Sequence, residues 1–446
     1  MKKRIGFVSL GCAKNLTDTE TMLGILTQDG YEITADASDA HIIVVNTCAF
    51  IDSAKEESIN SILEMAQYKE DRCELLIAAG CLAQRYREDI ERELPEVDII
   101  LGTTDYDSIS RAIESFYKDR KKLSIVGDAN TPVSYDLPRV KTTPPYTAYL
   151  KIADGCDNHC TYCIIPKLRG RYKSRPEDSI LSEARELAES GVKEIILIAQ
   201  DTAYYGKDRG EYALAPLLRR ISSIDGIEWI RLQYCYPENI TEELILEIAS
   251  NPKVVKYIDM PLQHVSDNVL RRMGRRSRQS EIEKLVDTFR SKIEDIVIRT
   301  SLIVGFPGET DEDFRLLKGF LKDYPLDRVG VFAYSCEEGT PASEFADQIP
   351  DSIKQSRRDE LMELLKQISL ERNKAKISCI TEAIVEGYDK GELCYVGRTA
   401  QDTPEVDGNA YIYSEYELKA GDIVKIRIID ADEYDITGEV TDEFTK

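Results

Sequence analysis

The sequence predicts an α/β protein in three parts: an N-terminal parallel α/β domain, a central partial (β/α)6 barrel and a small C-terminal antiparallel β-barrel. Short apolar runs alternate with helix-period segments through the first two parts, which is typical of parallel sheets flanked by helices. A proline-containing stretch separates these two parts, and towards the C-terminus the apolar period changes to two. We expect the domains at residues 1–138, 142–372 and 375–446.

Composition narrows the class of protein. With 446 residues the chain can form two or three domains, each with its own core. It has no long apolar run, and Met1–Arg4 leads directly into a strand-like segment, so we expect a cytoplasmic protein without a membrane anchor. Eleven cysteines without an export signal favour metal binding over disulfides. The net charge of −23 disfavours general binding to nucleic acid and favours a basic partner, with Arg271–Arg276 as a local exception.

The first domain alternates predicted strands and helices. Strands are expected at Ile5–Leu10, Ile42–Asn46, Leu75–Ala79 and Asp98–Leu101. Helices are expected at Thr17–Asp29, Ser53–Tyr68 and Gln84–Glu93. This alternation predicts a parallel sheet, whose functional groups gather where the strands end.

Three cysteines occupy the same topological position in that sheet. Cys12, Cys48 and Cys81 each follow one of the first three predicted strands, so their thiols should converge on one edge. Any one of them alone is more simply a buried apolar filler. Cys73 precedes its strand, at the opposite end of the sheet, and is interpreted as structural. The three converging thiols favour an iron–sulfur cluster.

The segment Ile125–Lys141, which contains Pro132 and Pro138, is predicted to be an extended linker. Strand and helix signals then alternate six times. Strands are expected at Tyr146–Ile152, Glu194–Ala199, Trp229–Gln233, Lys256–Asp259, Val297–Val304 and Val329–Ala333, with helices such as Ser179–Ser190, Glu242–Ile248 and Ser280–Ile293 between them. Six βα units are too few for a closed eight-stranded barrel, so one side should stay open to a large substrate.

A second cysteine motif follows the first of these strands. Cys156, Cys160 and Cys163 are spaced C-x3-C-x2-C, and three thiolates can hold three irons of a four-iron cluster. The fourth iron would then be free to bind a small molecule. A zinc knuckle or a chance cluster of cysteines is the alternative, but zinc usually has four ligands, commonly in paired CxxC units. The spacing resembles the signature of the radical S-adenosylmethionine (SAM) superfamily.

The last part of the chain changes character. A long charged helix is expected at Ser352–Glu371 as a connector. Strands with a period of two are expected at Ile380–Tyr388, Cys394–Thr399, Ala410–Tyr413 and Ile423–Ile429, within a small five-stranded barrel. From Thr381 to Lys446 there are 17 Asp or Glu against 6 Lys or Arg, a net charge of −11. An RNA-binding barrel should instead be basic, so the composition favours a basic protein as the partner.

The three parts together resemble the methylthiotransferase family of radical SAM enzymes over essentially the full length. The segments Gly11–Leu16 (GCAKNL) and Asn46–Ser58 (NTCAFIDSAKEES) are similar to the RimO branch of that family, which modifies ribosomal protein S-12. The tRNA-modifying branch typically has Gln-Met-Asn after its first cysteine. Two residues depart from the family pattern: Ala13 and Cys336 stand where proline is usual, and neither is expected to be a ligand.

The resemblance implies a reaction and its cofactors. The enzyme would add a methylthio group to the β-carbon of an aspartate in S-12, free or in the ribosome, using SAM and two 4Fe-4S clusters, with a low-potential donor such as a flavodoxin. The metal ligands implied are Cys12, Cys48, Cys81, Cys156, Cys160 and Cys163; no further catalytic residue is assigned.

Weaker signals mark four residues for SAM binding: Tyr162, Gln200, Asp201 and Arg299. Tyr162 is equally a core aromatic, and Arg299 could instead form a structural ion pair. Two alternative functions stay open. One is methylthiolation of tRNA adenosine, disfavoured by the motifs and the acidic barrel. The other is a non-catalytic iron–sulfur protein, which would more often use four cysteines per cluster.

Overall fold

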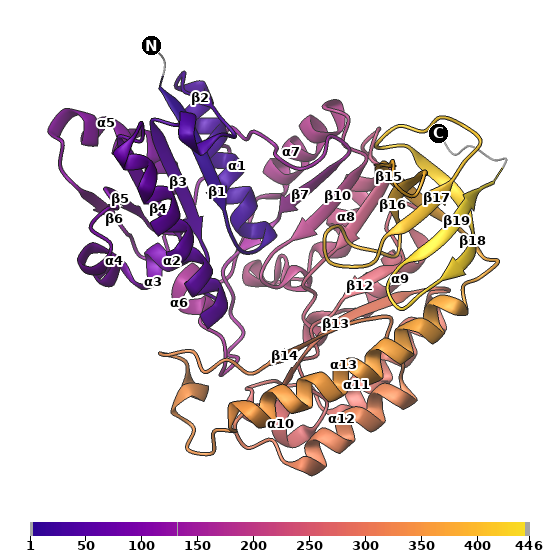
Figure 1. Cartoon of the computed structure of the whole chain (residues 1–446). Helices are drawn as coiled ribbons and strands as arrows, with labels where there is room; N and C mark the ends of the chain where they lie inside the picture. The colour runs from indigo at the N-terminus through magenta and orange to yellow at the C-terminus, as the bar shows by residue number, and fades with distance from the viewer. Residues whose placement is uncertain (1–2, 132, 442–446) are drawn as a thin grey trace.

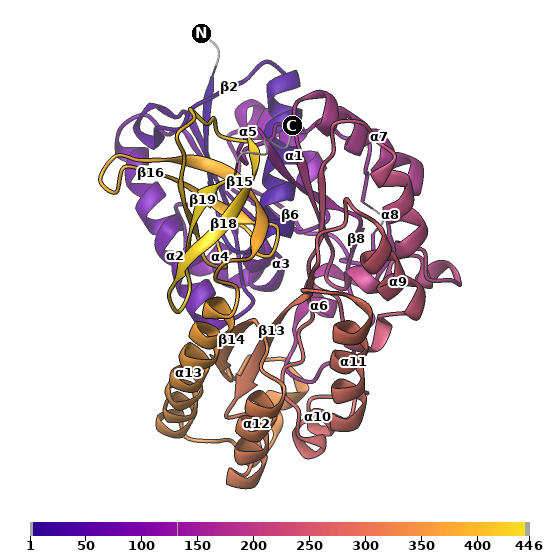
Figure 2. The same cartoon turned by 90° about the vertical axis from the view of Figure 1, so that its right-hand side faces the viewer.

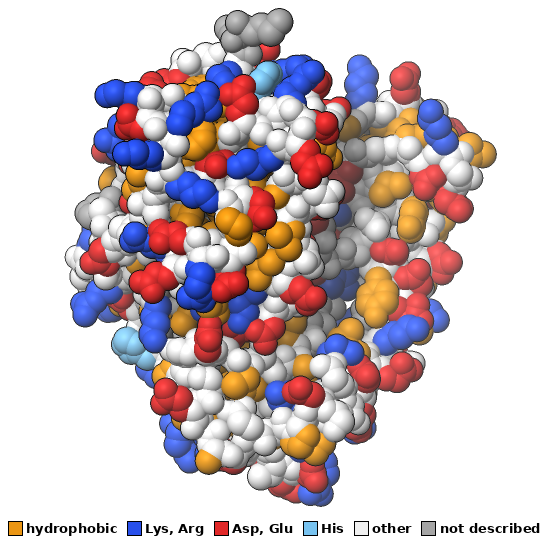
Figure 3. Space-filling model, turned by 60° about the vertical axis from the view of Figure 1, so that its left-hand side comes forward, with side chains coloured by type: hydrophobic (Ala, Val, Ile, Leu, Met, Phe, Trp, Pro, Cys, Tyr) orange, Lys and Arg blue, Asp and Glu red, His pale blue; other side chains and the backbone are white. Residues whose placement is uncertain are grey.

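The structure is a computed structural model that describes residues 3–131 and 133–441, so Pro132 of the predicted linker lies outside the described residues. Figure 1 shows the N-terminal domain on one side of the central barrel and the C-terminal barrel on the other. None of the helices over the described residues has the length and apolar character needed to span a bilayer. Acidic and basic side chains are interspersed over the face of the molecule shown in Figure 3.

The described residues of the N-terminal domain form a six-stranded parallel sheet in the order β2-β1-β3-β4-β5-β6. Its strands are β1 (Arg4–Ser9), β2 (Glu32–Ile33), β3 (Ile42–Thr47), β4 (Leu75–Gly80), β5 (Ile99–Leu101) and β6 (Leu123–Ile125). Its helices are α1 (Ala13–Gln28), α2 (Asp52–Ala66), α3 (Cys81–Arg85), α4 (Arg87–Glu93) and α5 (Ile109–Asp119). The predicted parallel sheet is confirmed, and β3 and β4 are buried along their whole length.

Three predicted boundaries in this domain were wrong. Helix α1 begins at Ala13 rather than Thr17, which makes Cys12 its N-cap residue. The predicted helix 84–93 is two helices that meet at Tyr86, where the backbone leaves the helical conformation. Ile125, the predicted start of the linker, is the last residue of β6, which pairs with β5 and extends the sheet.

The central domain follows the predicted βα pattern. Its strands are β7 (Thr147–Lys151), β10 (Glu194–Ile198), β11 (Trp229–Leu232), β12 (Tyr257–Asp259), β13 (Val297–Val304) and β14 (Arg328–Ala333). They form two parallel sheets, β11-β10-β7 and β12-β13-β14. An isolated parallel β-bridge between Ile230 of β11 and Val254, which precedes β12, joins the two sheets into one open, partial barrel. Its main helices are α6 (Ile165–Arg169), α7 (Glu177–Glu189), α8 (Leu214–Ser222), α9 (Glu242–Ser250), α10 (Asp267–Arg272), α11 (Gln279–Lys292) and α12 (Asp311–Asp323). The two short strands β8 (Ala153–Asp154) and β9 (Lys173–Ser174) pair beside the cysteine loop.

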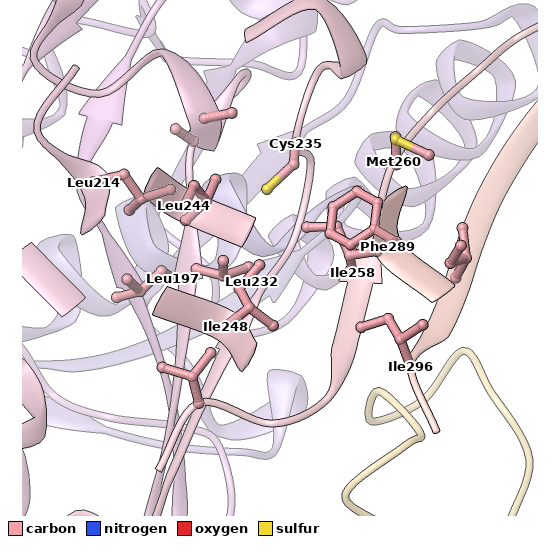
Figure 4. Close-up of a cluster of buried hydrophobic side chains, with 14 of the residues drawn as sticks. Leu197, Leu214, Leu232, Cys235, Leu244, Ile248, Ile258, Met260, Phe289 and Ile296 are labelled. Atoms are coloured by element: carbon pink, nitrogen blue, oxygen red, sulfur yellow. The ribbon is translucent and has the colours of Figure 1, made fainter. Parts of the chain in front are cut away.

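The main hydrophobic core lies between these strands and the helices outside them. Figure 4 shows part of it, with Leu197, Leu232 and Ile258 from the strands and Leu244 and Phe289 from the helices. Cys235 is fully buried in this cluster and is therefore a structural thiol. The core makes the partial barrel a rigid support for the loops at its ends.

The C-terminal part is a helix followed by a closed barrel. Helix α13 (Asp351–Lys374) packs against β14 and leads into strands β15 (Ile380–Asp389), β16 (Cys394–Thr399), β17 (Ala410–Tyr413), β18 (Ile423–Ala431) and β19 (Ile436–Val440). The barrel order over the described residues is β15-β16-β17-β19-β18. The predicted five strands are confirmed, but the pairing of β17 with β19 is parallel. Figure 2 shows this barrel from its outer side.

The C-terminal barrel caps the amino ends of the central strands. Trp229, Tyr257 and Val297 are the first residues of β11, β12 and β13, and they share an apolar cluster with Ile384 and Ile423 of the small barrel. The cysteine loop follows β7 and β8 and so lies at the opposite, carboxyl end of the strands. The small barrel therefore closes the base of the central domain and leaves the carboxyl ends free for chemistry.

Candidate functional site: two thiol triads

The first triad forms at the carboxyl ends of three adjacent strands. Cys12 follows β1, Cys48 directly follows β3 and Cys81 directly follows β4. Gly11 has a φ of 87°, and a Cβ there would lie 2.8 Å from the Cβ and 3.0 Å from the Sγ of Cys48. Only glycine lets the two cysteine-bearing turns approach this closely. The structure therefore brings these three predicted residues together, with buried Cys73 before β4 at the other end.

The three thiols differ in environment. Burial raises the pKa of Cys48 and raises that of Cys81 to about 11. Burial also acts to raise the pKa of Cys12, but the charges of Lys14 and Arg169 and two backbone N–H groups outweigh it and lower this pKa. Cys12 is thus the thiol of this triad that is poised to ionise, and it is exposed to solvent.

The second triad lies in the loop between β8 and α6. The N–H of Cys156 donates to the Gly170 carbonyl at 3.1 Å, and that of Cys163 donates to the Cys160 carbonyl at 3.1 Å. The Sγ of Cys160 lies 3.4 Å from the Oη of Tyr236. Burial raises the pKa of Cys156 to about 12, with the nearby Asp201 and Cys160 adding to the shift. The three thiols are near enough for their charges to interact.

Each triad offers the donor set of an iron–sulfur cluster. Among the described residues, no group of three or more His, Cys, Asp or Glu could hold a single metal ion, whereas the thiolates of an iron–sulfur cluster each bind a different iron. Each triad consists of thiols alone, the ligand type of iron–sulfur clusters, and three thiolates leave one iron of a four-iron cluster free. The high thiol pKa values belong to the metal-free protein, because a coordinating metal deprotonates a thiol outright. The residues present therefore fit such clusters.

Arg169 connects the two triads. It ends α6, directly after the second cysteine loop, yet its guanidinium reaches into the N-terminal domain. It donates to Asp18 at 2.6 Å and Asn15 at 3.2 Å, both on α1, and to the Sγ of Cys81 at 3.8 Å. A longer contact of 3.4 Å joins it to Asp154. One buried cation thus fixes the first triad against the loop of the second, a role that the sequence analysis missed because no local motif marks it.

Two of the four residues predicted to bind SAM lie beside the second triad. The Asp201 carboxylate accepts from Asn158 at 2.9 Å and from Asn239 at 2.6 Å, and burial raises its pKa to about 6. Asn158 lies within the cysteine loop, so Asp201 is held against it. Gln200 donates through Nε2 to Asp154 at 3.0 Å, while its buried Oε1 has no hydrogen-bond partner among the described residues.

The other two predicted residues have structural partners. Tyr162 packs edge-on against Phe306 with ring centroids 6.4 Å apart, as a core aromatic does. Arg299 forms ion pairs with Asp259 at 3.0 Å and with Asp407 at 3.4 Å. Asp407 belongs to the loop between β16 and β17, so this guanidinium is engaged by the C-terminal barrel and has the ion-pair role that was the alternative.

Other predicted features are explained by internal contacts. In the run Arg271–Arg276, Arg272 pairs with Asp347 and Arg275 pairs with Glu238 and lies over the ring of Tyr236 at 3.6 Å. This run is therefore not one basic patch. The sequence analysis missed Tyr236, which lies beside Cys160. The available signal was its position in the loop that follows β11, at the carboxyl end of the strand. Cys336 is exposed.

An open barrel with a three-cysteine loop after its first strand defines a radical SAM enzyme. Comparison with protein families agrees: the Radical SAM superfamily matches residues 150–321, the TRAM domain residues 378–441, and a family described as "Uncharacterized protein family UPF0004" residues 4–102.

Curated relatives identify the family more closely. The chain is 51% identical to the ribosomal protein uS12 methylthiotransferase RimO of Acetivibrio thermocellus, over 100% of both chains. It is 50% identical to the protein of the same name from Geobacter sulfurreducens, over 98% of this chain and 99% of that one. The chain belongs to the RimO family of radical SAM methylthiotransferases.

Solved structures of lower identity share the fold. TsrM from Kitasatospora setae, a radical SAM methyltransferase solved with cobalamin and a [4Fe-4S] cluster, is 15% identical with a TM-score of 0.55 and covers 77% of each chain. OxsB, a cobalamin-dependent SAM radical enzyme, is 13% identical with a TM-score of 0.50, over 82% of this chain and 56% of that one. At this identity the likeness concerns the fold alone.

Proposed function

We propose that the chain adds a methylthio group to the β-carbon of an aspartate in ribosomal protein uS12. The observation that carries the proposal is the pair of thiol triads held together by Arg169, because the reaction must both cleave an unactivated C–H bond and deliver sulfur to the same carbon. The names of relatives that are half identical over the full length support the substrate.

We assign each triad one 4Fe-4S cluster. With SAM bound, the cluster on Cys156, Cys160 and Cys163 would supply the electron that cleaves SAM to methionine and the radical that abstracts hydrogen. The cluster on the other triad would hold the sulfur, which carries a methyl group from a second SAM. Gln200, through its unpartnered Oε1, and Asp201 are the residues best placed to bind the SAM amino group. Tyr162 belongs to the same cysteine loop and would line the SAM site. Arg299 would support the site indirectly, through its ion pair with Asp259.

The partners follow from this assignment. The substrate would be uS12, either free or in the ribosome, and a basic ribosomal protein suits a chain with a net charge of −23. A low-potential donor such as a flavodoxin would supply electrons, in the cytoplasm where ribosomes are assembled. Methylthiolation of tRNA adenosine is the alternative that the test below must exclude.

The test reconstitutes the chain anaerobically with iron and sulfide and supplies SAM, sulfide and a reductant. We expect the aspartate-containing peptide of uS12 to gain the mass of SCH3 in place of H, and no modified nucleoside to form in tRNA. A modified adenosine in tRNA with an unchanged uS12 peptide would overturn the proposal. A protein that yields no 5′-deoxyadenosine from SAM would not be a radical enzyme at all.

Cysteine replacement tests the ligand assignment. We expect about eight irons per chain in the reconstituted protein, falling to about four when Cys12, Cys48 and Cys81 are replaced by Ala. Cys73→Ala is the matched control, since Cys73 is a buried thiol in the same domain but at the opposite end of the sheet, and it should leave the iron content unchanged. Equal iron loss in the control would refute the assignment.

A further inference from the structure

Lys14 is a buried cation beside Cys12 and Tyr234. It lies in the first turn of α1, is 7% exposed, and its Nζ is 3.2 Å from the ring centroid of Tyr234. Within the described part of the chain no carboxylate forms an ion pair with it, and the nearby Asp259 is paired with Arg299. Buried charges are normally paired because desolvation is costly, so an ammonium that Tyr234 holds without a carboxylate ion pair suits a carboxylate that arrives from outside.

The tyrosine beneath Lys14 is held in an unusual conformation. Tyr234 has a φ of 61°, in the left-handed region that a residue other than glycine rarely adopts. Two hydrogen bonds fix it there: its N–H donates to Asp259 at 3.0 Å, and its carbonyl accepts from the N–H of Thr202 at 2.9 Å. Tyr149 and Ile198 lie on the inner face of the barrel. The Tyr234 ring packs against them, together with Ala13 and Leu16 of α1. The ring is therefore a fixed platform for the ammonium.

The platform lies between the two triads. Lys14 follows Cys12 by two residues, and the charges of these two groups interact. Tyr236 follows Tyr234 by two residues, and its Oη lies 3.4 Å from the Sγ of Cys160. Cys12 is exposed to solvent, so a ligand can reach it from outside. A ligand bound beside Cys12 and Tyr234 would therefore lie near both triads and the ammonium.

We propose that Lys14 and Tyr234 form a carboxylate-binding subsite that holds the side chain of the substrate aspartate. This inference rests on the proposed function, in which the reacting β-carbon is bonded directly to that carboxyl group. The β-carbon is one bond from the carboxyl carbon, so an ammonium that binds the carboxylate also fixes the position of the β-carbon. It would hold this carbon between the group that abstracts hydrogen and the group that delivers sulfur. A charge-assisted hydrogen bond of this kind also selects aspartate over the neutral asparagine.

A carboxylate is also present in SAM, so the source of the anion must be tested. Lys14 is on the helix that starts at Cys12, whereas Gln200 and Asp201 lie beside the loop with Cys156. This placement favours the substrate. The predicted consequence is specific: loss of the Lys14 charge should weaken binding of the substrate and leave binding of SAM unchanged.

The experiment is a double-mutant cycle between enzyme and peptide. Reconstituted wild type, Lys14→Met, Lys14→Arg and the control Lys118→Met, which removes an exposed charge from α5, are titrated anaerobically with uS12 peptides that carry Asp or Asn at the modified position. Iron content, the Kd of SAM and the Kd of each peptide are measured. We expect wild type and Lys118→Met to bind the Asp peptide about 10–100-fold more tightly than the Asn peptide, Lys14→Arg to keep part of this preference, and Lys14→Met to lose it.

Each outcome decides between the possibilities. An Asp-over-Asn preference in Lys14→Met equal to that of wild type overturns the subsite. A weaker Kd for SAM, or loss of iron, in Lys14→Met with unchanged peptide binding also overturns it and assigns Lys14 to the cofactor. Failure of the proposed function is distinguishable, because wild type would then form no SCH3 product on the Asp peptide whatever the binding ratio.

Discussion

Arg169 shows at the level of one residue how the two halves of the site are joined. Its side chain is 3% exposed, and its partners Asp18 and Asn15 come from a helix more than a hundred residues earlier. Besides Arg169, the buried carboxylates of Asp18 and Asp154 have Lys151 as a cation partner. The network therefore carries two cations for two anions, and removing one cation leaves it unbalanced.

We predict that Arg169→Met destabilises the protein by about 3–5 kcal/mol, because it leaves a buried carboxylate without its cation. In the reconstituted protein the potential of the cluster on the first triad should also become more negative, since a positive donor beside Cys81 favours the reduced form. Urea unfolding and an EPR-monitored redox titration measure the two effects. The control Arg169→Lys keeps the charge and should recover most of the stability. A cluster potential in Arg169→Met equal to that of wild type would contradict the electrostatic role of Arg169.

His264 gives the protein a dependence on pH. It is fully buried, its Nδ1 accepts from the N–H of Ser266 at 2.9 Å, and its Nε2 has no partner among the described residues. Burial lowers the pKa of His264 to about 3. The folded state therefore keeps this imidazole neutral, whereas the unfolded state takes up a proton below about pH 6.5. The free energy of unfolding that the neutral imidazole contributes is fully present above pH 6.5 and is lost as the pH falls towards 3.

We predict that acidification from pH 7 to pH 5 removes about 2 kcal/mol of unfolding free energy through His264. In the variant His264→Asn, the side-chain oxygen can accept the same hydrogen bond from the Ser266 N–H. This variant should be less stable than wild type at pH 7, but it should not show the loss of unfolding free energy on acidification. Urea unfolding of both proteins at the two pH values measures the difference. Parallel pH dependence in the two proteins would show that His264 does not titrate as stated.

At the level of the element, helix α1 is the piece on which the site is built. Its N-terminus carries Cys12 and Lys14, and its middle packs against the segment that leads to the central domain. Glu20 pairs with Arg139, and the Glu20 carbonyl accepts from the N–H of Val140 at 3.0 Å. The segment predicted to be a linker is thus fixed along α1, so the two domains are joined rigidly where the triads meet.

Gly24 tests this packing. A Cβ at Gly24 would lie 2.2 Å from the Pro138 carbonyl oxygen, so Gly24→Ala must push the segment away from α1 and should cost about 1–3 kcal/mol. Gly319 in α12 is the matched control, because a Cβ there meets no described atom within 4 Å; Gly319→Ala should stabilise by up to about 1 kcal/mol through helix propensity. Thermal unfolding of both variants measures the contrast. Equal effects in the two would contradict close packing at Gly24.

At the level of the whole molecule, a buried ion-pair cluster attaches the C-terminal barrel to the central domain. Glu194, at the start of β10, is 0% exposed and accepts from Arg231 at 2.9 Å and from Arg398 of β16 at 3.1 Å. The chain's one tryptophan, Trp229, is buried nearby and donates to Glu382 of β15 at 3.3 Å. Its fluorescence therefore reports on this interface.

We predict that Glu194→Gln costs about 3–5 kcal/mol, because among the described residues Arg231 is left buried without a counter-charge and Arg398 keeps only its ion pair with Glu386. The emission of Trp229 should shift to the red at a lower urea concentration than in wild type. Glu243→Gln, which removes an exposed partner of Arg219, should change stability by no more than about 1 kcal/mol. A Trp229 transition in Glu194→Gln that coincides with wild type would show that the cluster does not secure the barrel.

The sequence alone determined the three-part fold, the family and the six cysteines predicted to be ligands. Apolar period, strand–helix order and cysteine spacing are local properties, and local properties can be read along a chain. Where helix α1 begins and where the linker starts were predicted wrongly, because tertiary packing sets both. The contacts of Arg169, Lys14 and Tyr234 were revealed only by the tertiary structure. Each joins segments far apart in sequence, and a side chain's partner across such a distance leaves no periodic trace. Arg299 illustrates this: its residue type allowed a cofactor contact or an ion pair, and the position of Asp407 provides the ion pair.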